Sequence, residues 1–327
     1  MKFSFFRYEL QPRYLPGATP PRPREGALIK VEWPIQNVIG VADCHPWVEF
    51  GDAPLHVQLE KLAKGHMTPI MEQTVWLAKR DGLARAKKNN LVQHNPRIRN
   101  HAIVMNPFKI QEGEFAAWRA LGYSHLKIKL GIDLKREIDW LNNIGKVQAF
   151  RLRLDFNSKL NWDTFEKFSS SIDPTVRTKI EFVEDPMPYV YEEWDRAKSL
   201  LPLAVDMESK NVDWDSNKFP FQFMVMKPAV QDVQTVVDRA TRARKPLIVT
   251  SYMDHPVGQL HALSIAGDLR RQYPNLILDC GLMTQHLYLD TPFTPFFKIQ
   301  GPYIMGVDGT GIGYDNLLAS LPWLKLN

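Results

Sequence analysis

Charged side chains stand at the ends of five successive apolar segments in the middle of the chain. In chain order they are Lys127 and Lys129, Asp155 with Asn157, Glu184 and Asp185, Asp206 and Glu208, and Lys227. If these segments are parallel barrel strands, their ends meet at the edge where barrel enzymes carry their chemistry. So many charges at one buried rim need a cation to pair them. Carboxylate oxygens suit Mg²⁺, with Mn²⁺ as an alternative, and the absence of histidine and cysteine from these ends argues against zinc.

The three lysines are spaced for proton transfer. Lys127 and Lys129 are two residues apart, so in a strand their side chains share one face, which in a barrel is the interior. Lys227 comes from a strand farther round and is expected to approach the same cavity from the opposite side. A lysine beside another cation in a partly desolvated pocket has a lowered pKa, which makes it a usable base near neutral pH.

Each of these residues has a plainer interpretation when it is taken alone. A single lysine or aspartate is commonly a solvated surface residue, Asp155 could be a helix cap, and Glu184-Asp185-Pro186 could be a turn. The ordered set across five consecutive segments is much harder to obtain by chance. We therefore predict a functional site at this edge.

The elements that would position these residues alternate between short apolar strands and amphipathic helices from about residue 99 onward. Strands are expected at 102–105, 125–129, 150–156, 179–183, 203–206, 221–226, 247–250 and 276–279. Helices are expected at 134–144, 162–169, 190–200, 233–244 and 259–271. About eight such units over residues 99–309 indicate a closed β/α barrel. No glycine-rich phosphate fingerprint follows the first strand, which argues against a dinucleotide-binding fold.

The first 98 residues follow a different order, with strands first and helices after them. Strands are expected at 2–11, 27–33 and 37–44, and helices at 55–62 and 70–86. A loop rich in proline and arginine, with Arg22 and Arg24, separates the first two strands. Segregated strands and helices indicate an α+β unit.

Composition limits the classes of partner. The chain of 327 residues is 44% hydrophobic and 24% charged, as expected of a soluble globular protein, and its net charge of +5 fits an anionic substrate or simply a mildly basic surface. The basic residues are scattered, so we expect no nucleic-acid partner. Neither a signal peptide nor a membrane span is predicted, and Cys44 and Cys280 lie far apart, as is typical of a reduced cytoplasmic protein. The oligomeric state is left open.

The ordered motifs resemble the muconate-cycloisomerase-like branch of the enolase superfamily, and within it most nearly the o-succinylbenzoate synthase family. The matching segments are 125–131 (HLKIKLG), 152–157 (LRLDFN), 180–186 (IEFVEDP), 204–209 (AVDMES) and 225–228 (VMKP), with weaker agreement at 250–258 and 309–313. The resemblance implies an N-terminal α+β capping domain and a modified TIM barrel of the (β/α)7β type. It leaves open whether the tail, about residues 310–327, returns to the capping domain.

The resemblance also implies roles for these residues. Asp155, Glu184 and Asp206 would bind the metal. Lys129 would be the base and then the acid, Lys127 would hold down the pKa of Lys129 and contact the substrate carboxylate, and Lys227 would stabilise the enolate or act as an opposing acid or base. Arg153, Asn157 and Ser251 would lie near the substrate, although Arg153 and Asn157 could instead lie behind the residues that contact it. The implied reaction is the Mg²⁺-dependent dehydration of 2-succinyl-6-hydroxy-2,4-cyclohexadiene-1-carboxylate to 2-succinylbenzoate in menaquinone biosynthesis, a carbon–oxygen lyase reaction.

Some positions depart from the family pattern and keep alternatives open. Met207 separates Asp206 from Glu208, so either carboxylate could be the third ligand, and Asp206 is preferred because it directly ends the apolar run. Arg22 and Arg24 could close over the substrate or belong to an ordinary solvated loop. An N-acylamino acid racemase or dipeptide epimerase on the same scaffold would use Lys129 and Lys227 as opposing bases. A barrel that only binds a ligand is the alternative outside enzymes.

Overall fold

The N-terminal part of the chain is an antiparallel sheet covered by two helices. The computed structural model describes residues 1–13, 22–147 and 149–326. The sheet has the order β13-β1-β2-β3, formed by β1 (Lys2–Leu10), β2 (Arg24–Trp33), β3 (Val38–Cys44) and the C-terminal β13 (Leu324–Lys325). The helices are α1 (Leu55–Ala63) and α2 (Pro69–Ala86). The three N-terminal strands and both helices are confirmed within a few residues of the predicted bounds.

Helix α2 packs closely on β3 because two glycines let the backbones approach. A Cβ atom at Gly40 would stand within 3 Å of the backbone of Ala78 and Gly82. The helix begins at Thr68, whose hydroxyl accepts from the N–H of Met71, with Pro69 in the first turn. The sheet and α2 thus form one tightly packed layer.

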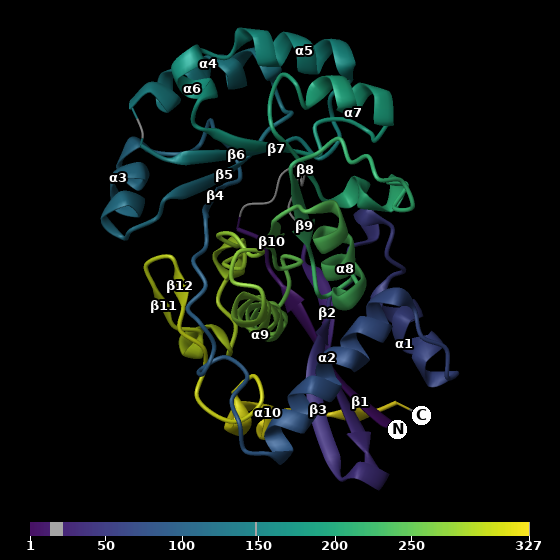
Figure 1. The fold of residues 1–327 in the computed structure, drawn as a ribbon. Coiled ribbons are helices and arrows are strands. Elements are labelled where there is room, and N and C mark those ends of the chain that lie inside the picture. Colours follow the sequence, from purple (N-terminus) through teal and green to yellow (C-terminus); the bar gives the residue numbers. More distant parts are fainter. Residues whose placement is uncertain (14–21, 148, 327) are drawn as a thin grey trace.

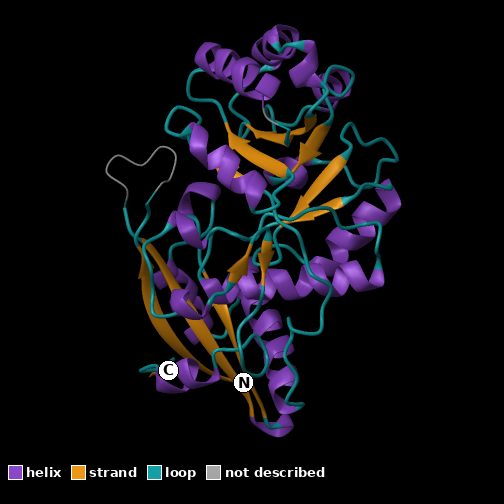
Figure 2. Ribbon diagram, turned by 90° about the vertical axis from the view of Figure 1, so that its left-hand side faces the viewer, coloured by secondary structure: helices purple, strands orange, loops and turns teal. Residues whose placement is uncertain are grey.

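Seven parallel strands in sequential order form the curved sheet of the second unit, as the alternating pattern predicts. They are β4 (Ala102–Val104), β5 (His125–Lys129), β6 (Arg151–Asp155), β7 (Ile180–Glu184), β8 (Leu203–Val205), β9 (Phe223–Met226) and β10 (Leu247–Val249). The helices are α3 (Glu112–Ala120), α4 (Leu134–Val147), α5 (Trp162–Ser171), α6 (Pro174–Arg177), α7 (Tyr191–Ala197), α8 (Val233–Ala243) and α9 (Pro256–Gln272), with α10 (Asp315–Ser320) near the C-terminus. Figure 1 shows α4–α7 along the outside of this sheet, and Figure 2 shows the long N-terminal strands apart from the short barrel strands.

The barrel helices bury an apolar stripe, and one of them is buried almost all round. Helix α8 buries Val233, Val236, Val237 and Ala240, which lie on one face at helical spacing. Helix α9 is buried from Pro256 to Gly267 because it also packs against β3 of the N-terminal sheet. None of the helices in the described ranges has the length and apolar character needed to cross a bilayer.

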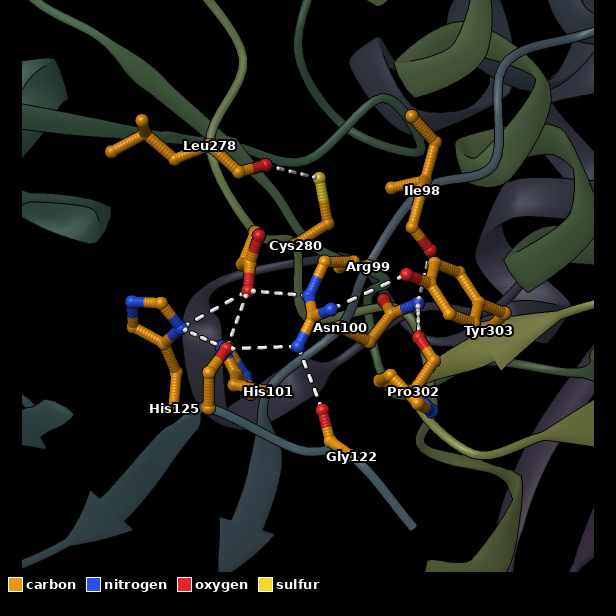
Figure 3. A network of polar contacts seen from close by, with 12 residues as sticks. Ile98, Arg99, Asn100, His101, Gly122, His125, Leu278, Cys280, Pro302 and Tyr303 are labelled. Carbon is orange, nitrogen blue, oxygen red and sulfur yellow. Dashed lines mark hydrogen bonds and ion pairs between the residues drawn. The ribbon is translucent and has the colours of Figure 1, made fainter. Parts of the chain in front are cut away.

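The predicted eighth strand, residues 276–279, is wrong as a strand. Leu247 of β10 bonds it twice: Leu247 N–H donates to Leu276 O (2.7 Å), and Leu278 N–H donates to Leu247 O (2.9 Å). The pairing with β10 and with the residues before β4 consists of isolated bridges, so no continuous ladder forms. The segment nonetheless closes the ring of strands, and Figure 3 shows the polar contacts on its side toward residues 98–101.

Candidate active site

A cavity of about 300 Å³ opens at the carboxyl ends of the strands. Six of the predicted site residues line it: Lys127, Lys129, Asn157, Asp206, Lys227 and Ser251. Strand alternation points both β5 lysines inward, while Ile128 between them is buried in the hydrophobic core. Phe50 and Asp52, from the loop after β3, also line the cavity, so the N-terminal unit contributes part of its wall.

The strand register places the carboxylates beside the lysines. Lys129 is the lateral partner of Asp155, and Asp155 is the partner of Glu184. The Lys127 ammonium lies 2.7 Å from both oxygens of Glu184 and 2.9 Å from Asp155 Oδ2. Lys129 Nζ donates to Asp155 (2.5 Å) and to Asn157 Oδ1 (2.9 Å). On the far side, Lys227 forms an ion pair with Asp206.

The protonation of this cluster follows from burial and mutual charge. Burial raises the pKa of Glu184 to about 7, with Asp155 adding to the shift and Lys127 opposing it. Burial alone would also raise the pKa of Asp155, but Lys127 and Lys129 hold it below its usual range. Burial lowers the pKa of Lys127, yet Asp155, Glu184 and Asp206 outweigh burial and raise it.

The carboxylates fit a divalent cation by their chemistry and placement. Asp155, Glu184 and Asp206 are buried, and they belong to three consecutive strand ends. In the described part of the chain, no three potential ligand side chains converge as a ready-made metal cluster. The Lys127 ammonium lies between Asp155 and Glu184. A positive charge therefore already occupies the position between two of the three carboxylates, and a hard cation suits the same oxygens.

The two candidates for the third ligand occupy different surroundings. Asp206 lines the cavity. Glu208 points into the loop structure behind it, where it accepts from Ser158 Oγ (2.8 Å), from the N–H of Tyr189 (2.9 Å) and from Asn211 Nδ2 (2.8 Å). Ser158 follows β6 and Tyr189 follows β7, so the Glu208 carboxylate links its own loop to the two preceding strand-end loops.

Asp185 has a role that the sequence motif did not reveal. Its backbone φ is +37°, and its carboxylate accepts from the N–H groups of Asp206 (2.9 Å), Met207 (2.7 Å) and Glu208 (3.3 Å). These three residues form the start of the 3₁₀ helix Met207–Asn211 and the turn before it. Asp185 therefore fixes the backbone that carries Asp206.

Arg153 lies one layer below the cavity and does not line it. Arg153 precedes Asp155 by two residues on β6, so both side chains lie on the same face of the strand. Like Asp155, the Arg153 side chain is fully buried. It donates to Glu181 (2.5 Å), to Asp279 O (2.6 Å) and to His101 Nδ1 (3.1 Å). Arg153 thus lies beneath the cavity, which is one of the two positions that the resemblance allows for it.

The remaining predicted residues divide between the cavity and the surface. Asn157 lines the cavity with φ +48°, and Ser251 lines it while its hydroxyl pairs with Thr284 Oγ1 (2.8 Å). Arg24 lies in β2, where it pairs with Glu49 (2.5 Å) and stacks over Trp47, outside the cavity wall. Arg22 is exposed, and the loop residues 14–21 lie outside the described residues.

Further wall residues were not predicted. Tyr252 donates to Asp52 (3.0 Å), which joins the wall to the N-terminal unit. His101, Thr250 and Gly281 form the side of the cavity where the ring of strands closes. Thr250 adjoins the predicted Ser251 at a strand end and could have been found there. Nothing in the local sequence distinguishes Asp52 or His101.

Comparison with known proteins agrees with this architecture. Residues 3–84 match the family model described as the O-succinylbenzoate synthase N-terminal domain. A protein from Bdellovibrio bacteriovorus named o-succinylbenzoate synthase is 40% identical, over 100% of this chain and 99% of its own length.

Solved structures share the fold at low sequence identity. The L-Ala-D/L-Glu epimerase from Bacillus subtilis superposes with a TM-score of 0.78 at 15% identity, covering 96% of this chain and 98% of its own. A mandelate racemase/muconate lactonizing protein from Herpetosiphon aurantiacus gives 0.76 at 15% identity, covering 95% and 96%. The predicted two-part fold is thus confirmed. The chain belongs to the o-succinylbenzoate synthase family, lyases of the enolase superfamily.

Proposed function

We propose that this chain dehydrates 2-succinyl-6-hydroxy-2,4-cyclohexadiene-1-carboxylate to 2-succinylbenzoate, as a cytoplasmic step of menaquinone biosynthesis. Family membership supports this substrate. The observation that carries the mechanism is that Lys129, Lys227 and Asp206 face one cavity, with Asp155 directly beside Lys129 and Glu184 beside Asp155 on the next strand. That arrangement suits proton removal next to a carboxylate.

Asp155, Glu184 and Asp206 are proposed to hold a divalent cation, Mg²⁺ or alternatively Mn²⁺. When bound, the cation supplies charge neutralisation for the substrate carboxylate as negative charge develops on it. The position of Asp206 in the cavity supports it over Glu208, whose oxygens are engaged by the loop.

Lys129 is proposed to act as base and then as acid. Its neutral amine takes the ring proton next to the carboxylate, and the electron pair left behind forms the new ring double bond as the hydroxyl group departs. The Lys129 ammonium then protonates the departing hydroxide to give water, which restores the amine. Bonds to Asp155 and Asn157 orient Nζ for both steps. Lys227, on the opposite wall, stabilises the developing enolate charge.

Replacing Lys129 tests this proposal. With Mg²⁺ and the cyclohexadiene substrate, Lys129→Ala is expected to lose about a thousand-fold or more in kcat, since a positioned base contributes roughly that much. EDTA should abolish turnover of the wild type. Lys135→Ala, at an exposed position of α4, is the matched control and should keep full activity. Undiminished turnover by Lys129→Ala would remove this residue from the mechanism.

The placement of Lys129 and Lys227 on β5 and β9 also favours a second candidate reaction. Two bases facing one cavity are what an N-acylamino acid racemase or dipeptide epimerase requires. We would incubate the protein with N-succinylamino acids in D₂O and follow exchange at the α-carbon. Racemisation without dehydration would move the proposed function to this reaction while keeping the same site.

A further inference from the structure

The cavity wall opposite the carboxylates carries polar groups that the proposed mechanism does not use. His101 precedes β4, Thr250 follows β10, and Gly281 belongs to the closing segment between them. Thr250 and Gly281 are bridged as parallel partners, and the N–H of His101 donates to Cys280 O (2.9 Å). Backbone hydrogen bonds therefore hold these three residues together as one wall.

The tautomer of His101 follows from its partner. Arg153 Nη1 lies 3.1 Å from His101 Nδ1, and a guanidinium can only donate, so Nδ1 is the acceptor and carries no proton. Burial, with the charges of Arg153 and Lys127, keeps the pKa of His101 well below its usual value, so the ring is neutral. The single ring proton is therefore on Nε2.

The imidazole of His101 packs directly against Gly281, and only a residue without a Cβ leaves room for the ring there. A Cβ at Gly281 would lie 2.7 Å from Nε2 and 2.6 Å from Cε1 of the imidazole. Thr250 Oγ1, on the same wall, is buried and has no hydrogen-bond partner among the described residues. A buried hydroxyl without a partner is costly, so a hydroxyl at this position points to a ligand atom as its partner.

The charges nearby identify the kind of atom that fits. The cations closest to this wall are already paired, Arg153 with Glu181 and Lys127 with Glu184. The wall thus offers two neutral donors, which suit an uncharged carbonyl oxygen better than a carboxylate. A second hollow of about 640 Å³ shares His101, Ile103 and Met283 with the first, and provides room for a flexible chain beyond the carbonyl.

We propose that His101 Nε2–H and the Thr250 hydroxyl, on this wall of the cavity, bind the ketone oxygen of the substrate's succinyl group. The inference rests on the proposed function and deepens it, because it names the residues that distinguish a 2-acyl substrate. The ring carboxylate lies at the opposite wall, near Asp155, Glu184 and Asp206. His101 and Thr250 then set the orientation of the ring between the two walls.

Two substitutions at His101 separate substrate binding from structural support. His101→Asn keeps an acceptor for Arg153 but removes the donor at the Nε2 position, whereas His101→Gln keeps a donor near Nε2 and loses the Arg153 contact. By calorimetry with Mg²⁺ present, His101→Asn should bind 2-succinylbenzoate about ten-fold more weakly, the effect of one lost hydrogen bond, and His101→Gln should recover part of it. His66→Asn, at an exposed position, should bind as the wild type does.

An analogue of 2-succinylbenzoate that lacks the ketone oxygen tests whether His101 contacts that atom. Binding of 2-(3-carboxypropyl)benzoate, in which CH₂ replaces the ketone, should be the same in wild type and His101→Asn. An equal loss for both ligands would assign the contact to another oxygen and overturn the proposal. So would normal product binding by His101→Asn together with a lowered melting temperature of His101→Gln, since that pattern means a structural role.

Thr250→Val tests the contribution of the Thr250 hydroxyl to substrate binding independently of His101. Removing an unpartnered buried hydroxyl should leave the melting temperature of the free protein unchanged or higher, while the KM for the cyclohexadiene substrate rises about five- to ten-fold with little change in kcat. An unchanged KM would contradict the role of Thr250. If the wild type does not dehydrate the substrate at all, the proposed function fails, whereas normal turnover with unaffected variants defeats only this inference.

Discussion

At the scale of single residues, the choice of the third carboxylate is the sharpest question that the site raises. Asp206→Asn is expected to abolish turnover and the rise in melting temperature that Mg²⁺ produces, because a ligand is lost. Glu208→Gln should keep the Mg²⁺ response but lower the stability by about 1–2 kcal/mol, since Glu208 accepts three hydrogen bonds from its loop. Thermal melts with and without Mg²⁺ distinguish the two. Loss of the Mg²⁺ response only in Glu208→Gln would reverse the assignment.

Residue type, strand position and the family resemblance were enough to predict the six charged or polar residues named above that line the cavity. Lys127, Lys129 and Asp206 follow from the rule that barrel chemistry lies at strand ends. Arg153 does not, because sequence spacing says which face a residue shares but not how deep its layer lies. Asp52 and His101 could not be found either, since each reaches the cavity through tertiary packing alone.

At the scale of elements, the short 3₁₀ helix Met207–Asn211 depends on one buried acceptor. Asp185→Ala would leave the N–H groups of Asp206, Met207 and Glu208 without their carboxylate, at an expected cost of about 2–4 kcal/mol in the free energy of unfolding. Displacement of Asp206 should also lower kcat at saturating Mg²⁺. Urea unfolding and steady-state kinetics measure the two effects. Asp213→Ala, at an exposed position in the following loop, is the control, and equal behaviour of both variants would refute this role.

The predicted helices and strands are confirmed where the apolar residues repeat regularly, and the prediction is wrong where the backbone hydrogen bonds are irregular. Helix α8 was predicted because Val233, Val236, Val237 and Ala240 repeat at helical spacing. Residues 276–279 are apolar enough for a strand, but they pair with β10 through an isolated bridge between Leu247 and Ile277 and not through a continuous ladder. The pairing of β13 with β1 joins distant parts of the chain and carries no local signal. The local sequence pattern therefore predicts single helices and strands better than it predicts which segments pair at the edge of a sheet.

At the scale of the whole molecule, the two units are joined through buried polar contacts between the N-terminal sheet and α9. His261 of α9 is hydrogen-bonded to Val41 O of β3 (2.9 Å), and His255 donates its backbone N–H to Asp43 (3.1 Å). Asp81 of α2 accepts from the N–H groups of Val41 (2.9 Å) and Ile312 (2.8 Å), which ties the C-terminal segment to the same layer. The cavity wall formed by Asp52 and Tyr252 spans this junction, so its geometry depends on how the units are held together.

The buried histidines of this junction make its stability sensitive to acid. Burial lowers the pKa of His45, His255 and His261 to about 3 from an ordinary value of 6.5, so between these values the unfolded chain binds more protons than the folded one. The stability that these three histidines contribute by staying neutral is therefore fully present above pH 6.5 and is lost as the pH falls toward 3. Burial raises the pKa of Asp254 to about 7, which acts in the opposite direction, so a single substitution is more informative than the wild-type profile.

His261→Gln can still donate to Val41 O but cannot titrate. Below pH 6, the slope of unfolding free energy against pH should fall by about one proton, or about 1.4 kcal/mol per pH unit, relative to the wild type. Urea unfolding from pH 7 to pH 4 gives the slope. His66→Gln, at an exposed position, should leave it unchanged. A wild-type slope in His261→Gln would mean that His261 is protonated in the folded protein, and acid sensitivity would then have to come from elsewhere than the junction between β3 and α9.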